Sequence, residues 1–209
     1  MSDTSERAVG QTGTEDRIRV AGVCGSLREV SYTRLALNRA LEEAARAGAE
    51  IDLIDLRRLH LPLYDPDVDR GDAGDADELA GRLLEADAIL LGSPMYHGSY
   101  SSPLKTALDY CGFDEFEDKT VGLLAVAGGS FPVTTLDHLR SVCRSLNAWV
   151  LPHQAAVVRS YAAFEDGEFV DPAVEDRVAT LGRRAVQYAR IEPDPASFES
   201  DQNVGAVDR

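Results

Sequence analysis

A turn rich in glycine and hydroxyl residues lies near the start of the chain, between an apolar run and an amphipathic stretch. The turn spans Gly25–Thr33 and follows Ile18–Cys24. In an α/β protein, such a turn joins the carboxyl end of a strand to the start of a helix, where unpaired N–H groups and the helix dipole bind anions. Hydroxyl and guanidinium donors strengthen such a site, although a solvated surface arginine is the alternative for Arg28. The expected phosphate-binding residues are Ser26, Arg28, Ser31 and Thr33.

A second loop, Gly92–Ser99, combines proline and glycine with two flat side chains. Proline and glycine fix an irregular backbone whose polar groups face outward, and flat side chains suit a planar heteroaromatic ring. The alternative is an ordinary turn, because these residue types mark loops generally. His97 is read as an exposed loop histidine at least as readily as a general acid. The expected ring-contacting residues are Pro94, Met95, Tyr96, His97 and Gly98.

A third loop follows the apolar run Thr120–Ala127 and consists of Gly128, Gly129 and Ser130. Small residues let the chain pass close to a ligand. Taken together, the three loops describe a phosphate cradle, a ring-holding loop and a point of close approach. These are the parts of a mononucleotide site, and flavin mononucleotide (FMN) has one terminal phosphate and one large ring.

Patterns typical of strands and helices alternate along the chain, which predicts a doubly wound parallel α/β sheet. Ligands of such folds bind beyond the carboxyl ends of the strands, so we expect the three loops to meet at one edge. The expected domain covers 17–191, between a disordered arm over 1–16 and a polar tail over 192–209. The expected strands are Ile18–Cys24, Glu50–Leu56, Ala88–Gly92, Thr120–Ala127 and Ala148–Leu151, and the expected helices are Thr33–Ala47, Ala76–Ala86, Pro103–Tyr110, Thr134–Asn147 and Pro172–Ile191.

Composition argues against several classes of protein. The formal net charge is -15, whereas binding to nucleic-acid phosphates needs basic patches, so we expect no nucleic-acid partner. No apolar stretch is long enough to span a bilayer or to form a signal peptide, so we expect a soluble, cytoplasmic protein and no membrane partner. Scattered histidines and cysteines without a C-x-x-C motif predict no metal site. The acidic, lysine-poor composition favours a halophilic, salt-rich habitat over the alternative of a GC-rich genome.

These motifs together resemble those of the NADPH-dependent FMN reductase family of flavodoxin-like proteins, from about Ile18 to Tyr188. The resemblance implies a flavodoxin-like three-layer sandwich with a five-stranded parallel sheet of order 2-1-3-4-5. It also implies a homodimer or homotetramer with flavin near the subunit interface, and it places Gly128, Gly129 and Ser130 at the far edge of the flavin ring. Family members commonly carry an acidic residue where Met95 stands. The motifs are Gly25-Ser26-Leu27-Arg28-x-x-Ser31, Ser93-Pro94-Met95-Tyr96-His97-Gly98-Ser99, Leu104-Lys105-x-x-x-Asp109-Tyr110 and Gly128-Gly129.

The resemblance implies an oxidoreductase whose chemistry is carried by FMN. Hydride passes from NADPH or NADH to flavin N5, and the electrons then pass to a small-molecule acceptor: a flavin, a quinone, an azo compound or a metal ion. No dedicated acid or base is needed, so no catalytic residue is expected. The main alternative is a flavodoxin-type electron carrier that does not oxidise NAD(P)H directly. A dinucleotide-binding dehydrogenase with Asp55 as ribose partner is disfavoured, because its G-x-G-x-x-G pattern is incomplete.

Overall fold

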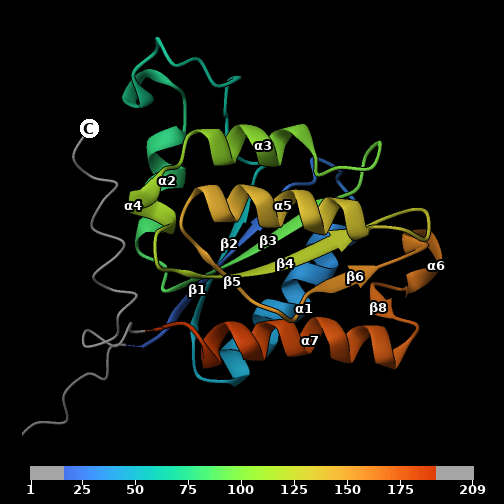
Figure 1. Ribbon diagram of the computed structural model, residues 1–209. Coiled ribbons are helices and arrows are strands. Elements are labelled where there is room, and N and C mark those ends of the chain that lie inside the picture. The colour runs from blue at the N-terminus through green and yellow to red at the C-terminus, as the bar shows by residue number, and fades with distance from the viewer. Residues whose placement is uncertain (1–16, 192–209) are drawn as a thin grey trace, which may run out of the picture.

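The computed structural model describes residues 17–191, and its central feature is a parallel sheet (Figure 1). The strands stand in the order β2-β1-β3-β4-β5, which confirms the α/β class and strand order predicted from the sequence. The expected arm over 1–16 and tail over 192–209 lie outside the described residues. The strands of this sheet are β1 (Arg19–Cys24), β2 (Glu50–Asp55), β3 (Ala88–Pro94), β4 (Thr120–Val126), β5 (Trp149–Val150) and β6 (Ala155–Val157).

Strands β3 and β4 lie in the middle of the sheet, and every residue in them is buried. Their sequences, AILLGSP and TVGLLAV, are almost wholly apolar, because central parallel strands are covered on both faces. Strand β2 stands at one side of the sheet and alternates charged with apolar residues. This arrangement is the one that the two kinds of pattern predict.

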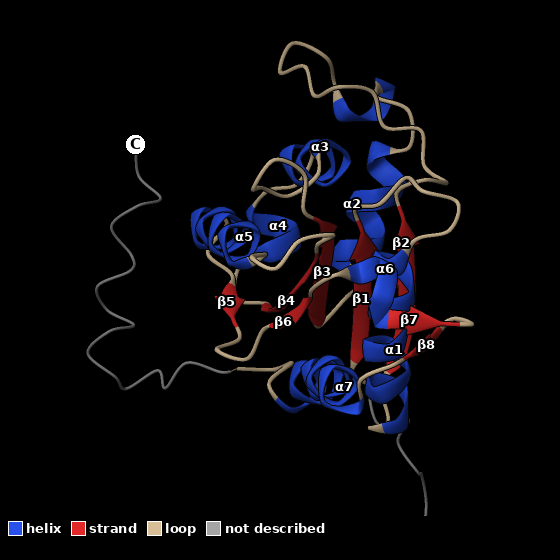
Figure 2. Ribbon diagram, turned by 90° about the vertical axis from the view of Figure 1, so that its right-hand side faces the viewer, coloured by secondary structure: helices blue, strands red, loops and turns tan. Residues whose placement is uncertain are grey.

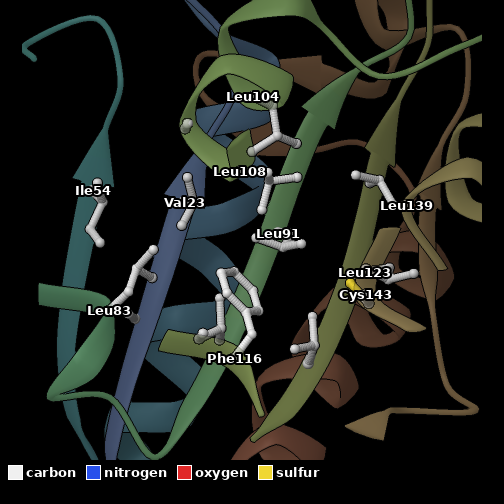
Figure 3. Packing of buried hydrophobic residues seen from close by; sticks show 14 of the residues in the cluster. Val23, Ile54, Leu83, Leu91, Leu104, Leu108, Phe116, Leu123, Leu139 and Cys143 are labelled. Carbon is white, nitrogen blue, oxygen red and sulfur yellow. The ribbon is translucent and has the colours of Figure 1, made fainter. Parts of the chain in front are cut away.

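Helices cover both faces of the sheet and complete a three-layer sandwich (Figure 2). Helices α1 and α7 pack against each other on one face, and α2, α3, α4 and α5 cover the other. Figure 3 shows the core on the second face, where Leu83, Leu104 and Phe116 meet residues of the strands. The helices are α1 (Tyr32–Arg46), α2 (Ala76–Leu84), α3 (Ser102–Asp109), α4 (Phe113–Phe116), α5 (Val133–Ser145) and α7 (Pro172–Gln187), with a short 3-10 turn η1 (Arg70–Asp72) before α2.

The fifth position of the sheet differs from the single strand predicted over Ala148–Leu151. Strand β5 pairs with the start of β4, and β6 pairs with the end of β4. Pro152 lies between the two segments. Proline has no N–H to give to a ladder, so the chain leaves the sheet there and rejoins it at Ala155. The prediction therefore found the first half of the strand and missed the second.

The stretch between β6 and α7, for which no element was predicted, contains a short helix and a hairpin. They are α6 (Ser160–Ala163), β7 (Phe164–Glu165) and β8 (Glu168–Phe169). Asp166 and Gly167 have φ of 51° and 88°, as a two-residue type I′ turn requires. An Asp-Gly pair is typical of this turn, so the sequence did carry a signal for the hairpin. Figure 2 shows α6 in front of β1, at the edge where the strands end.

The carboxyl ends of the strands remain bonded to one another beyond the sheet itself. The N–H of Gly25 donates to the Gly92 carbonyl at 2.8 Å, and the N–H of Met95 donates to the Val126 carbonyl at 2.8 Å. All three predicted loops are thereby held at one edge, as expected.

No helix within residues 17–191 is long and apolar enough to cross a membrane. The same residues contain no cluster of three His, Cys, Asp or Glu side chains suited to a metal ion.

Candidate functional site

A cavity of about 390 Å³ opens at the carboxyl edge of the sheet, between the three predicted loops. Its volume falls within the range of small-molecule sites, roughly 300–1,000 Å³. Of the residues predicted for the site, those that line the cavity are Ser26, Arg28, Thr33, Pro94, Met95, Tyr96 and Gly128. The predicted residues Ser31, His97, Gly98, Gly129 and Ser130 lie nearby but do not line it. The lining residues that sequence reasoning missed are Tyr32, Val126, Ser160 and Tyr161.

One end of the cavity is formed by the start of α1. Ser31 is the N-cap of this helix, and its Oγ accepts a hydrogen bond from the Arg34 N–H at 3.1 Å. The N–H groups of Tyr32 and Thr33, in the first turn, have no acceptor inside an α-helix. The Ser26 and Thr33 side chains are both 2% exposed and border the cavity beside these N–H groups. This end therefore collects backbone and hydroxyl donors suited to an anion.

The turn from Ser26 to Val30 is held in place by hydrogen bonds that its backbone carbonyls accept from two arginines. The Arg57 guanidinium donates to the Leu27 carbonyl at 2.6 Å, and Arg34 donates to the carbonyls of Arg28 and Glu29. Because these carbonyls are engaged by guanidinium groups, the conformation of the turn is set by the protein rather than by a ligand. A preset turn binds an anion without the entropic cost of ordering it.

Asp55, at the end of β2, is a partner of Arg34. The two side chains form an ion pair at 3.2 Å, and Asp55 is only 6% exposed. Its Oδ1 also accepts from the Arg57 N–H at 3.2 Å. The carboxylate is thus used inside the protein, which counts against its service as the ribose partner of a dinucleotide-binding dehydrogenase.

The loop after β3 is a tight hairpin turn. Tyr96 and Ser99 exchange two backbone hydrogen bonds, at 3.0 and 3.1 Å, and the turn residues His97 and Gly98 have φ of 50° and 82°. These positive angles describe a type I′ turn, in which His97 and Gly98 form the tip. Their place at the tip explains why they do not line the cavity, whereas Met95 and Tyr96, which precede them, do.

Ser101 joins this loop to the turn after β1. Its Oγ donates to the Gly25 carbonyl at 2.6 Å, and its N–H donates to the Ser93 Oγ at 3.0 Å. Ser101 is also the N-cap of α3. A Cβ on Gly25 would lie 2.8 Å from the Ser101 Oγ and 2.9 Å from the Leu104 Cβ. Glycine is therefore required at position 25 by close approach of α3, and the two loops are held in register by the same contact.

The remaining wall comes from α6 and from the aromatic contacts around it. Ser160 and Tyr161 line the cavity, and the Ser160 N–H donates to the Ala127 carbonyl at 3.0 Å. Tyr32 stacks on Phe164, with ring centroids 5.3 Å apart and an interplanar angle of 9°. The stack attaches the segment after α6 to the first turn of α1. The wall was missed because these partners are distant in sequence.

No carboxylate or imidazole lines the cavity; its ionisable residues among the described ones are one arginine and three tyrosines. The Cys24 thiol lies at the start of the turn before α1, and burial raises its pKa, so it stays neutral there. General acid–base catalysis by a carboxylate or histidine of the cavity wall is therefore not built into this site. What the arrangement does supply is an anion-binding end, a flat and mainly apolar section, and a partly open mouth beside Tyr96 and Tyr161, which are 46% and 69% exposed.

Comparison with known proteins places the chain among flavin-dependent reductases. A family model described as NADPH-dependent FMN reductase matches residues 18–162. The FMN-dependent NADPH-azoreductase of Staphylococcus aureus (strain USA300) is 35% identical over 153 residues, which cover 70% of this chain and 81% of that protein. Among solved structures, the flavoenzyme NAD(P)H:(acceptor) oxidoreductase (FerB) from Paracoccus denitrificans has a TM-score of 0.68 at 22% identity, over 82% of this chain and 97% of the other.

A flavodoxin from the domain Archaea has a TM-score of 0.58 at 13% identity, over 82% of this chain and 99% of the other. At identities this low, the solved structures speak for the flavodoxin-like fold alone. Enzymes and a flavodoxin share that fold, so the fold by itself does not distinguish catalysis from electron carriage.

Proposed function

The chain belongs to the NADPH-dependent FMN reductase family and is an FMN-dependent NAD(P)H oxidoreductase, and from that premise we propose that the cavity is its FMN site. The observation that carries this proposal is the convergence on one cavity of the start of α1, the loop after β3 and the loop after β4. An anion-binding end and a flat section in one cavity match a molecule with one phosphate and one large ring.

The donor set at the anion-binding end fits the FMN phosphate. Ser26 and Thr33 would donate their hydroxyls, and the first N–H groups of α1 would donate along the helix axis. Arg28 is exposed, borders the cavity and has no side-chain partner among residues 17–191, so its guanidinium is available for a phosphate. Ser31 supports this end as the helix cap, in addition to the phosphate contact predicted from the sequence.

The ring would lie along Pro94, Met95, Tyr96 and Gly128. When bound, FMN accepts hydride from NAD(P)H and delivers the electrons to an acceptor. The protein holds the ring by backbone and side-chain contacts and leaves the side beside Tyr96 open for the nicotinamide. Met95 contributes no charge where family members commonly have an acid. Contacts with the ring also remain proposed for the other predicted residues of these two loops, which lie beside the cavity but do not line it. They are His97, Gly98, Gly129 and Ser130.

A small-molecule acceptor is the favoured partner of the reduced enzyme. The named activity of the S. aureus relative supports an azo compound as one such acceptor, and flavins, quinones and metal ions remain in the proposal. The flavodoxin-type electron carrier, the alternative weighed from the sequence, is supported only by the net charge of -15, because acidic surfaces dock to basic partners. The family to which the chain belongs favours the enzyme, with NADPH or NADH as the electron donor.

The test is anaerobic mixing of the purified, FMN-loaded protein with NADPH or NADH in a stopped-flow spectrometer. The proposal expects a yellow protein whose flavin absorbance bleaches rapidly and recovers when an acceptor is added. A flavin that stays oxidised over many seconds would support the carrier instead. A protein that neither binds FMN nor oxidises NADPH in its presence would refute the site altogether.

Arg28→Ala tests the orientation of FMN in the cavity. Because a hydrogen bond to a charged group contributes about 1.5–3 kcal/mol, FMN binding should weaken about 10- to 100-fold. Riboflavin has the same ring without the phosphate, so its affinity should be unchanged. Fluorescence quenching of each flavin on titration with apoprotein measures both constants. An equal loss for the two flavins would place Arg28 at the ring and not at the phosphate.

Assembly and location belong to the same proposal. A homodimer or homotetramer is favoured by an apolar groove of about 550 Å³ beside β5, which includes Trp149, Leu151 and Tyr188. Trp149 is half exposed and is the one tryptophan of the chain, so its fluorescence reports on that groove. Light scattering at several salt concentrations tests both the assembly and the halophilic character.

A cytoplasmic location is also proposed, because the three cysteines form no disulfide.

A further inference from the structure

Most arginines within residues 17–191 have a side-chain partner, and a few do not. Within residues 17–191, the arginines whose side chains contact no partner are Arg17, Arg28, Arg144 and Arg159. Arg17 precedes β1, and Arg144 lies in the last turn of α5, which runs back along the sheet away from the cavity. Arg28 lines the cavity, and Arg159 directly precedes the lining residue Ser160. A protein with a net charge of -15 thus leaves two guanidinium groups without carboxylates at its proposed site.

The position of Arg159 is fixed by the backbone on both sides. Its own N–H donates to the Gly129 carbonyl at 3.0 Å, and the next N–H, of Ser160, donates to the Ala127 carbonyl at 3.0 Å. Ser160 and Tyr161 line the cavity directly after it. Arg159 has φ of 46° and ψ of 50°, a left-handed conformation that L-residues with long side chains rarely adopt. The exposed side chain therefore starts from a defined point on the loop after β4.

Arg28 and Arg159 belong to different ends of the site. Arg28 lies in the turn before α1, where the FMN phosphate is proposed. Arg159 is bonded to the loop after β4, and the carbonyl of Val126, the last residue of β4, accepts from the Met95 N–H at 2.8 Å. Met95 belongs to the ring end. Since FMN has one phosphate, Arg159, whose backbone is bonded to Gly129 beside the proposed ring end, is left for the other ligand of the site.

The other ligand is a nicotinamide dinucleotide, which has a pyrophosphate and, in NADPH, a 2′-phosphate. Guanidinium groups bind phosphates as bidentate donors. The overall negative charge of the protein repels such a ligand, so a local positive group at the mouth of the cavity raises both its affinity and its rate of association. We propose that Arg159 binds a phosphate of the nicotinamide dinucleotide and is the substrate-binding counterpart of Arg28. This assignment rests on the proposed function of the cavity.

The experiment compares four variants of the FMN-loaded protein. Arg159→Gln removes the charge, Arg159→Lys retains it without the fork, and Arg144→Gln is the matched control for loss of an exposed, unpartnered arginine. Arg159→Gly also removes the charge and suits a φ of +46°, so a loss of binding in this variant is not due to backbone strain. Calorimetry with adenosine 2′,5′-bisphosphate and with ADP-ribose measures phosphate binding, and steady-state kinetics measures KM for NADPH and NADH.

Arg159→Gln and Arg159→Gly should weaken binding about tenfold, and Arg159→Lys by less, whereas Arg144→Gln should bind like the parent protein. A loss confined to adenosine 2′,5′-bisphosphate and NADPH identifies the 2′-phosphate; a loss that includes ADP-ribose and NADH identifies the pyrophosphate. Unchanged binding of both probes in the Gln and Gly variants overturns the proposal. So does a loss of FMN affinity instead. Failure of the parent protein to bind FMN at all would refute the proposed function separately.

Discussion

Substitution of Gly25 by alanine tests the contact that holds the turn between β1 and α1 against α3. The added methyl would lie 2.8 Å from the Ser101 Oγ, 2.9 Å from the Leu104 Cβ and 3.2 Å from the Gly92 carbonyl oxygen. All three distances are shorter than ordinary van der Waals contact. Gly25 is not in the left-handed region, so alanine suits its backbone, and the whole effect should come from overpacking.

The magnitude follows from what has to move. Overpacking in a well-packed interior costs about 1–3 kcal/mol, and displacing Ser101 weakens its 2.6 Å hydrogen bond to the Gly25 carbonyl, a further loss of about 1 kcal/mol. We expect Gly25→Ala to lower the free energy of unfolding by about 2–4 kcal/mol in total. For a chain of this size, that corresponds to a fall in Tm of roughly 4–16 °C.

The assay is urea unfolding of apoprotein and FMN-loaded protein, followed by circular dichroism. Two other glycines serve as controls, because a Cβ on Gly81 or Gly128 meets nothing within 4 Å. Gly128→Ala should change the stability of the apoprotein by less than about 0.5 kcal/mol. Gly81→Ala, inside α2, should raise it by about 0.5–1 kcal/mol.

Ser101→Ala separates the two contributions in a double-mutant cycle. Without the Oγ, the methyl at position 25 loses its nearest neighbour, so Gly25→Ala should cost less in the Ser101→Ala background, by about 1 kcal/mol. The expected overpacking is absent if Gly25→Ala changes the free energy of unfolding as little as Gly128→Ala does. The reasoning is also wrong if the variant is destabilised yet binds FMN as tightly as the parent, because the turn would then not depend on this contact.

Three further predictions concern stability and thiol chemistry. Gly182→Ala should cost about 3 kcal/mol or more, because its methyl would overlap a backbone carbonyl of α1; an unchanged melting temperature would contradict this. The pKa of Glu43 is lowered from 4.5 to about 2, mainly by hydrogen bonding from Arg39. The free energy of unfolding should therefore fall as the pH drops from 4.5 to about 2. Glu43→Gln should reduce this pH dependence in acid unfolding titrations. Burial raises the pKa of Cys111 and Cys143 to about 12. Ellman's reagent at pH 8 should therefore modify these thiols only after denaturant is added. Rapid labelling of both thiols in the native protein would contradict this prediction.

The parts of the fold that were predictable are those with a clear pattern of burial, above all the strands buried on both faces. Strands β3 and β4 are continuous apolar runs, and only a central parallel strand requires such a run. The fifth position was only half predicted, since a strand broken at Pro152 looks like a strand that ends there. Its second half, Ala155–Val157, is too short to show a pattern and is specified by pairing with β4.

The candidate site divides in the same way. Glycine- and hydroxyl-rich turns after strands are local signals, so they led to the loops that border the cavity. Which residues of a loop face inward is decided by backbone geometry within it. Met95 and Tyr96 precede the hairpin tip and line the cavity, whereas His97 and Gly98 form the tip and do not. The sequence indicates a loop with proline and glycine, but it does not indicate that the two-residue hairpin turn begins at His97.

The wall made by Ser160 and Tyr161 depends on contacts between distant parts of the chain. It stands where it does because Tyr32 stacks on Phe164 and because the hairpin turn at Asp166 returns the chain to α7. No local pattern expresses such a contact. The same wall borders the cavity beside Tyr161, which is 69% exposed. The loops that border the cavity are therefore encoded mainly in short motifs, whereas the wall formed by Ser160 and Tyr161 is encoded in tertiary packing.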